Sequence, residues 1–232
     1  MDLSQLEQKI GIVFNNKNLL KEALTHRSYL NENPKWSVEF LSPHNERLEF
    51  LGDAVLELIS TEILFNKFPK SKEGDLTSIR AALVNYQMLA GVAKEIGLDE
   101  FILLSRGEAK DIGKAREVIL ANAFEAFLGA IYLDAGYEVS KRFIESAVMN
   151  HLDEVIEKKL YKDPKSLLQE IAQEKFKITP TYSVLEEKGP DHAKIFKIGV
   201  YFSQNLIAEG EGLSKQEGEV EAAKNALHSL QH

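Results

Sequence analysis

The chain has 232 residues, 44% of them hydrophobic, which is enough to bury real cores and fits two domains better than one. It contains no Cys, which excludes disulfides, thiolate zinc sites and a Cys nucleophile and fits a reducing, cytoplasmic setting. The net charge of −8 argues against a simple nucleic-acid-binding protein, because phosphate binding usually requires a basic excess.

The first part of the chain has helical periodicity. Its opening segment, MDLSQLEQKIGIVF, lacks the apolar core of a signal peptide, and no run of about 18 uncharged apolar residues indicates a membrane span, so we expect no membrane partner. No segment up to residue 159 alternates convincingly as a strand would. We therefore expect an all-α domain over residues 1–160. Its predicted helices span residues 18–24, 45–65, 75–85, 87–96, 116–134 and 138–159.

A different pattern follows the charged stretch EKKLYKDPKS, which we interpret as a linker. The apolar residues of IFKIGVYF alternate with period two, which is typical of a strand. The apolar residues of the last segment recur at helical spacing. Residues 161–232 are therefore predicted to form a small α+β domain in the order α-β-β-β-α. The predicted elements are a helix over 165–175, strands over 181–187, 195–202 and 206–209, and a final helix.

The segment HNERLEFLGDAVLEL, residues 44–58, carries acids at helical spacing. Glu46, Glu49 and Asp53 stand at i, i+3 and i+7, so they share one face of a helix. Their apolar neighbours are expected to be mostly packed, and both repulsion and desolvation would then oppose ionisation of the acids. These neighbours are Leu48, Phe50, Leu51, Ala54, Val55 and Leu58.

A second helix repeats this theme. Its segment VILANAFEAFLGAIYL has one charged residue, Glu125, with Asn122 three positions earlier on the same face. Two such helices packed face to face would form an oxygen-rich cluster suited to Mg²⁺ or Mn²⁺. Composition alone favours a metal site only slightly over ordinary salt bridges. A di-iron bundle is disfavoured, because neither Glu49 nor Glu125 has a His three residues later.

Residues 45–53, NERLEFLGD, match the motif of the ribonuclease III family over their whole length. Further segments resemble the family in the same order: ALTHRSY at 23–29, EGDLTSIRAALV at 73–84 and ANAFEAFLGAIYLDAG at 121–136. The resemblance to bacterial ribonuclease III implies a Mg²⁺-dependent endonuclease that cuts double-stranded RNA. It also implies products with 5′-phosphates and short 3′ overhangs, and substrates among ribosomal RNA precursors and messenger RNAs.

The resemblance implies that Glu49, Asp53 and Glu125 bind metal at the scissile phosphate, with Asp53 and Glu125 as catalytic residues. Family members usually carry Asp at the position of Asn122. The amide oxygen of Asn122 can still coordinate Mg²⁺, but it is neutral and weaker. Three interpretations stay open: a natural variant that coordinates through its carbonyl, an engineered change that traps uncut RNA, or a natural enzyme of low activity. A binding protein that has lost cutting is the rival function.

The resemblance also assigns residues outside the metal set. It implies that Glu46 and Glu73 help to place RNA and hydrated metal. It further implies a homodimer formed through the motif helix, in which Phe50 enters a socket on the partner subunit. An ordinary core position for Phe50 remains the alternative.

Residues 163–230 resemble a double-stranded-RNA-binding domain through DPKSLLQEIAQ, PTYSVLEEKGPDHAKIFKIGV and GEGLSKQEGEVEAAKNAL, in that order. Such domains contact minor grooves and phosphates of A-form duplexes. Residues 161–232 hold nine Lys and eleven Asp plus Glu, a net charge of −2, so we expect weak, salt-sensitive binding by this domain. A protein-interaction module and a helical metal-storage protein are the alternatives. The implied RNA contacts are Gln169, Glu170, His192, Lys215 and Lys224.

Overall fold

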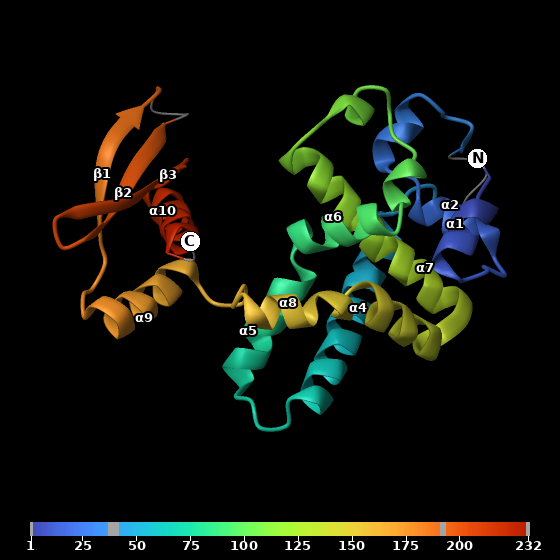
Figure 1. Cartoon of the computed structure of the whole chain (residues 1–232). Coiled ribbons are helices and arrows are strands. Elements are labelled where there is room, and N and C mark those ends of the chain that lie inside the picture. The colour runs from blue at the N-terminus through green and yellow to red at the C-terminus, as the bar shows by residue number, and fades with distance from the viewer. Residues whose placement is uncertain (1, 37–41, 191–193, 231–232) are drawn as a thin grey trace. The chain divides into compact units, whose positions relative to one another are not determined.

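The computed structural model describes residues 2–36, 42–190 and 194–230 (Figure 1). The chain divides into two compact units, residues 1–161 and 162–232. Within the described residues, the first unit is helical apart from an isolated bridge between Thr25 and Leu103, and the second has a three-stranded sheet with two helices. The predicted fold class, an all-α domain followed by an α-β-β-β-α domain, is confirmed.

The helices of the first unit follow the predicted order, with two differences. A first helix, Ser4–Ile10, was not predicted, and the predicted helices 116–134 and 138–159 are organised differently. They run on through a kink at Gly136 (φ 79°, ψ −174°), and the long helix then ends at Ala147. The elements are α1 (Ser4–Ile10), α2 (Lys17–Ala23), η1 (Arg27–Asn31), α4 (Glu46–Lys67), α5 (Glu73–Val84), α6 (Tyr86–Glu95), η2 (Leu98–Glu100), η3 (Glu108–Lys110), α7 (Lys114–Ala147), η4 (Met149–His151) and α8 (Leu152–Glu157).

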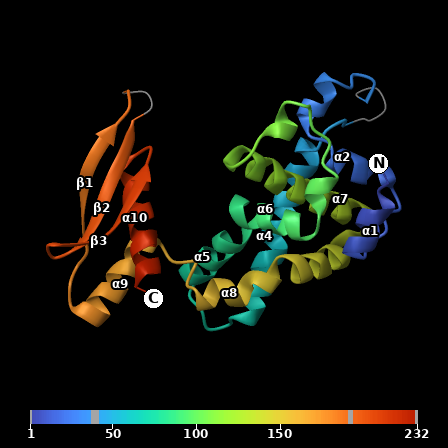
Figure 2. The ribbon, with the colours of Figure 1, turned by 45° about the horizontal axis from the view of Figure 1, so that its top comes forward.

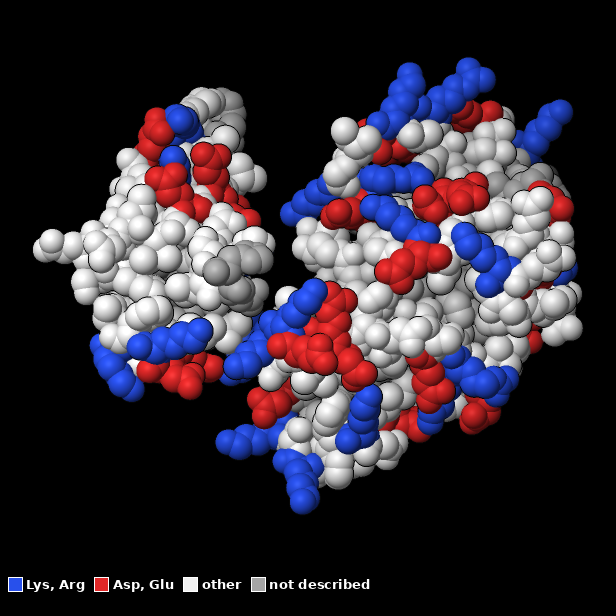
Figure 3. Space-filling model, in the orientation of Figure 1, with Lys and Arg blue, Asp and Glu red and all other residues white. Residues whose placement is uncertain are grey.

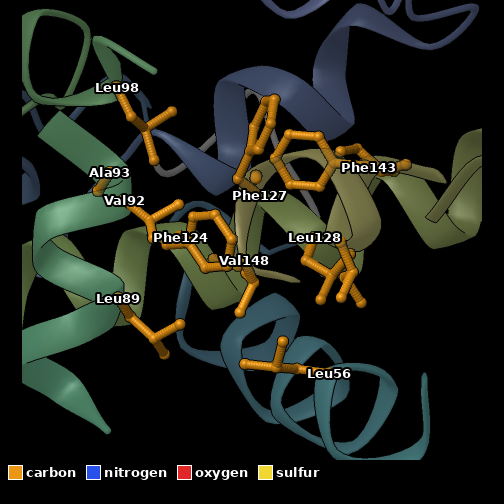
Figure 4. Packing of buried hydrophobic residues seen from close by; sticks show 14 of the residues in the cluster. Leu56, Leu89, Val92, Ala93, Leu98, Phe124, Phe127, Leu128, Phe143 and Val148 are labelled. Atoms are coloured by element: carbon orange, nitrogen blue, oxygen red, sulfur yellow. The ribbon is translucent and has the colours of Figure 1, made fainter. Parts of the chain in front are cut away.

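Helix α7 is the centre of the first unit, and its most extensive packing is against α4. Phe124 and Phe127 of α7 are fully buried, and Figure 4 shows them among side chains from other helices, such as Leu56 of α4 and Leu89 of α6. Each buried side chain of this size stabilises the fold by about 1.5–3 kcal/mol relative to an exposed one. This core holds the N-terminal half of α7 against α4.

The segment Lys114–Glu157 is also the place where the helical unit is most apolar. By length and composition alone, it could cross a membrane. However, 61% of its most apolar window is buried inside the fold, and the core contacts above account for its composition.

The second unit is an antiparallel sheet in the order β1-β2-β3, with α10 packed along one face (Figure 2). Ile198, Val200 and Phe202 of the central strand are buried, as the period-two pattern predicted. Val200 and Phe202 share this core with residues of both helices, including Leu168 and Ala223. The elements are α9 (Pro164–Phe176), β1 (Thr181–Lys188), β2 (Ile195–Phe202), β3 (Asn205–Gly212) and α10 (Lys215–Ser229).

Candidate active site

Helices α4 and α7 touch backbone to backbone where two glycines face the opposite helix. A Cβ atom at Gly52 would lie 1.7 Å from the carbonyl oxygen of Glu125, and one at Gly129 would lie 2.3 Å from that of Leu48. Only glycine permits so close an approach. The acids of α4 are thereby placed next to Asn122 and Glu125 of α7.

Glu125 is partly buried at this crossing. Burial raises the pKa of its carboxyl to about 7, and the negative charges of Asp53 and Glu49 act in the same direction. Among the described residues, no Lys or Arg is one of the groups that shift this pKa. A cation bound beside this carboxyl group would offset both the cost of burying its charge and the repulsion from Asp53 and Glu49.

Glu49 is also partly buried, and the groups that shift its pKa identify its neighbours. Burial raises the pKa of its carboxyl, and the charges of Glu46 and Asp53 raise it further. A hydrogen bond from the Asn122 side chain lowers it. The structure thus brings together Glu49, Asp53, Asn122 and Glu125, the residues that the sequence singled out for metal binding.

This group of three carboxylates and one amide fits a hard divalent cation, since such ions prefer oxygen ligands. In the described ranges, no three His, Asp or Glu side chains already form a set that could hold a metal ion. The partial burial of Glu49 and Glu125 and the repulsion from neighbouring carboxylates both favour a bound cation at this place.

Glu46 lies one turn before Glu49, at the exposed N-terminal end of α4. Its Oε1 is 3.4 Å from Nη1 of Arg27, and its Oε2 is 3.8 Å from Nδ1 of His44. It lies close enough to raise the pKa of Glu49. Glu46 thus borders the carboxylate cluster and remains open to solvent.

Glu73 is not brought to this cluster within one chain. It begins α5, where its Oε1 accepts a hydrogen bond from Thr77 (3.1 Å), and it lines a pocket of about 490 Å³. Phe65, which lines the same pocket, lies about 24 Å along α4 from Glu49 at 1.5 Å per residue. Glu73 therefore lies near the end of α4 that is opposite to Glu49. The pocket is lined by Thr61, Leu64, Phe65, Ser71, Glu73, Leu76, Thr77 and Arg80.

A row of apolar side chains on α4 is exposed. Phe50 is 83% exposed, Leu58 61% and Phe65 68%, and Ala54 between them is also exposed. We call these four residues the α4 stripe. We predicted that the apolar neighbours of the acids are mostly packed. This holds for Leu48 and Val55. Within this chain it is wrong for the stripe residues Phe50, Ala54 and Leu58. The interpretation of Phe50 as an ordinary core aromatic is likewise wrong.

The predicted RNA contacts of the second unit lie on its helices. Gln169 and Glu170 are exposed on α9, and Glu170 forms an ion pair with Lys162 (2.6 Å). Lys215 is the first residue of α10 and is exposed. Lys224 is exposed further along α10, where it pairs with Glu221 (3.1 Å). The remaining predicted contact, His192, lies outside the described residues.

Sequence reasoning passed over the two glycines of the crossing and Glu187, which contacts Lys194 and Lys215. A signal for the glycines was present, because Gly in the middle of an apolar helix costs stability unless close packing requires it. No local signal marks Glu187, whose lysine partners come from other parts of the chain.

Two family models match the chain. The model described as Ribonuclease-III-like matches residues 16–152, and the double-stranded RNA binding motif matches residues 164–230. A protein named Ribonuclease 3 from Carboxydothermus hydrogenoformans is 46% identical over 231 residues, covering 100% of this chain and 97% of that protein. One from Streptococcus agalactiae is 44% identical over 228 residues, covering 98% of each. The chain belongs to the ribonuclease III family.

A solved structure agrees with this membership. The nuclease domain of ribonuclease III from Campylobacter jejuni is 46% identical to the matching part, with a TM-score of 0.55, and covers 63% of this chain and 98% of that chain. As a member of the ribonuclease III family, the chain is an endoribonuclease with a domain that binds double-stranded RNA. The alternatives of a metal-storage protein and a general protein-interaction module are wrong.

Proposed function

We propose that this ribonuclease III is a Mg²⁺-dependent homodimer that hydrolyses both strands of double-stranded RNA, leaving 5′-phosphates and short 3′ overhangs. We further propose a cytoplasmic role in processing ribosomal RNA precursors and messenger RNA. One observation carries the metal-dependent chemistry. Carboxylates of α4 and α7 meet where the two backbones touch. Burial and neighbouring acids raise the pKa of Glu49 and of Glu125, and no protein cation is among the groups that shift these two pKa values in the described residues.

Mg²⁺, when bound, supplies charge neutralisation at the phosphate and a water molecule of lowered pKa, and Mn²⁺ can substitute for it. The protein's part is to hold oxygen ligands in a rigid frame. Asp53 and Glu125, on facing helices, would hold the cation at the scissile phosphate. Glu49 and the amide oxygen of Asn122 would complete the protein ligands, and Asn122 must then turn its carbonyl inward, since its amide now donates to Glu49.

The α4 stripe supports the homodimer. An exposed row of large apolar side chains along one helix is typical of an interface between subunits. Two-fold pairing of antiparallel α4 helices would place Phe50, near the start of one α4, opposite the pocket at the end of the other. The C. jejuni structure is described as flexible in a region involved in dimer formation, which agrees with an interface in this domain.

The same pairing would give Glu73 its role. Glu73 lines the pocket at the far end of α4, so the Glu73 of a partner subunit would lie near the carboxylate cluster of the first. It could position RNA there together with Glu46, which is exposed at the start of α4. Each cutting centre would then combine residues of both subunits.

The function is tested by incubating the protein with a long RNA duplex in Mg²⁺, in Ca²⁺ and in EDTA. We expect short duplex products with 5′-phosphates in Mg²⁺ alone. A second function, binding without cutting, is favoured by one observation, the neutral Asn122 among the carboxylates. Retarded but intact RNA under all three conditions would support that function and contradict the endonuclease.

A further inference from the structure

Glu187 of β1 bridges two lysines that come from different elements of the second unit. Its Oε2 lies 3.2 Å from Nζ of Lys194, which precedes β2, and its Oε1 lies 3.7 Å from Nζ of Lys215, at the start of α10. Lys215 Nζ also lies 5.7 Å from the ring centroid of Phe196, the strand partner of Glu187. One carboxylate thus joins the entry to β2 with the start of α10.

The start of α10 is itself firmly capped, so Glu187 acts on the Lys215 side chain and not on the helix. Ser214 Oγ accepts a hydrogen bond from the backbone N–H of Glu217 (3.1 Å). Glu217 Oε2 accepts one from the backbone N–H of Leu213 (2.9 Å). This reciprocal pair fixes the first turn. Glu187 contacts the ammonium group of Lys215 beside this capped turn.

Other described lysines of this unit also form ion pairs, but the acid in each of those pairs contacts one lysine and not two. Figure 3 shows blue and red side chains interspersed on the visible face of the second unit, without a continuous basic stripe. Among the ion pairs of the described residues 162–190 and 194–230, Glu187 is the acid that contacts two lysines. The other pairs join one lysine to one acid: Lys162–Glu170, Lys165–Glu219, Lys188–Glu186, Lys197–Glu209 and Lys224–Glu221.

We propose that Glu187 occupies the place of an RNA phosphate between Lys194 and Lys215, so that duplex RNA must displace it and Glu187 limits RNA affinity. This inference rests on the proposed function as a double-stranded RNA nuclease and takes the RNA contact that the resemblance implies for Lys215 to be a contact with phosphate. A carboxylate that offers one oxygen to each of two ammonium groups resembles the two free oxygens of a phosphodiester. All three side chains are partly exposed, and exposed ion pairs are weak, so a phosphate can displace the carboxylate.

The test compares Glu187→Gln with the unaltered full-length chain, binding a fluorescent RNA duplex of about 20 base pairs in EDTA, which prevents cutting. Removal of the carboxylate takes away the acid that competes with phosphate for Lys194 and Lys215. We expect affinity at moderate salt to rise about 3- to 10-fold, and the slope of log K against log salt to steepen by about 1–2. Matching circular-dichroism melting curves would verify that the variant folds.

Glu209→Gln is the matched control. It removes the same charge from the same unit, but Glu209 pairs with Lys197 (2.5 Å) on strands β3 and β2. We expect a change of less than about twofold. An equal gain in both variants would show an effect of net charge and overturn the proposal. Weaker binding by Glu187→Gln would show instead that Glu187 holds its lysines in place for RNA, which also overturns it.

The Lys215→Gln variant tests whether Lys215 contacts phosphate, independently of whether Glu187 competes with phosphate. If Lys215 contacts phosphate, this variant binds RNA more weakly than the unaltered chain, and adding Glu187→Gln to it recovers only part of the gain. Unchanged binding by Lys215→Gln would contradict the phosphate contact itself. A full gain from Glu187→Gln in that background would show that the bridge to Lys215 has no part in the effect.

Discussion

Replacing Glu125 by Gln should stabilise the protein without Mg²⁺ at alkaline pH, although it removes a proposed metal ligand. Gln has nearly the same shape and cannot ionise. Burial raises the pKa of Glu125 from 4.5 to about 7 in the folded protein. The folded state therefore holds this proton more tightly than the unfolded state does. The carboxyl group costs nothing below about pH 4.5. Its cost grows between pH 4.5 and about 7 and stays constant above that.

The size of the effect follows from the two pKa values. Each pH unit between 4.5 and about 7 corresponds to about 1.4 kcal/mol, which gives an upper limit of about 3.4 kcal/mol. Glu125 is only partly buried, so solvent screens the charges of Asp53 and Glu49. We therefore expect the Gln variant to gain about 1–2 kcal/mol in its free energy of unfolding near pH 8, and almost nothing near pH 4.5.

The assay is urea unfolding in EDTA at both pH values, followed by circular dichroism. Adding Mg²⁺ should then stabilise the unaltered protein more than the variant, because the variant has lost a ligand charge. RNA cleavage should be lost, while RNA binding in EDTA is kept. Glu138→Gln, on the exposed side of α7, serves as the control and should change little at either pH. A Glu125→Gln protein that is less stable at both pH values would show that Glu125 is a structural partner, and the reasoning would be refuted.

Three further substitutions, one of them with a control, address the rest of the site. Gly52→Ala should cost about 3 kcal/mol or more in thermal unfolding, because its Cβ would lie 1.7 Å from a carbonyl oxygen of α7. Gly91→Ala, on α6 with no atom within 4 Å of its Cβ, should instead gain up to about 1 kcal/mol; similar losses in both would contradict the crossing. Phe50→Glu should give monomers in sedimentation experiments and reduce cleavage, and an intact dimer would exclude the α4 stripe as the interface. Asn122→Asp should lower the Mg²⁺ concentration needed for half-maximal cleavage, and superimposable titrations would refute a ligand role for this position.

Much of the fold was predictable, because its helices and strands have strong periodicity. The difficulties lie where local sequence is ambiguous. Gly136 correctly marked a change of direction, but it could not show whether the helix stops or only bends, and α7 continues beyond it. The end at Ala147 has no Gly or Pro nearby to announce it. Such an end depends on which tertiary contacts follow, and not on helix propensity.

The candidate site shows the same division. The meeting of Asp53 with Glu125 was predictable, because helical spacing places each on a defined face. The exposure of the apolar residues on α4 was not predictable from the sequence. An apolar residue such as Leu58 fits the helical pattern equally well whether it packs into the core or contacts another subunit. The role of Gly218 also depends on packing: a Cβ there would lie 2.6 Å from Cγ1 of Ile198, so the absence of a side chain lets α10 lie close to β2.

The contact of Gly52 and Gly129 with the opposing backbone also bears on how this enzyme can vary. Main-chain atoms already touch, so the spacing of α4 and α7 at that level is at its minimum, whatever side chains fill the interior above and below. A smaller side chain at an interior position such as Leu56 or Phe124 cannot draw the helices closer at this level, because the main chains are already in contact. Two residues that lack side chains thus set the shortest distance between the helices that carry Asp53 and Glu125.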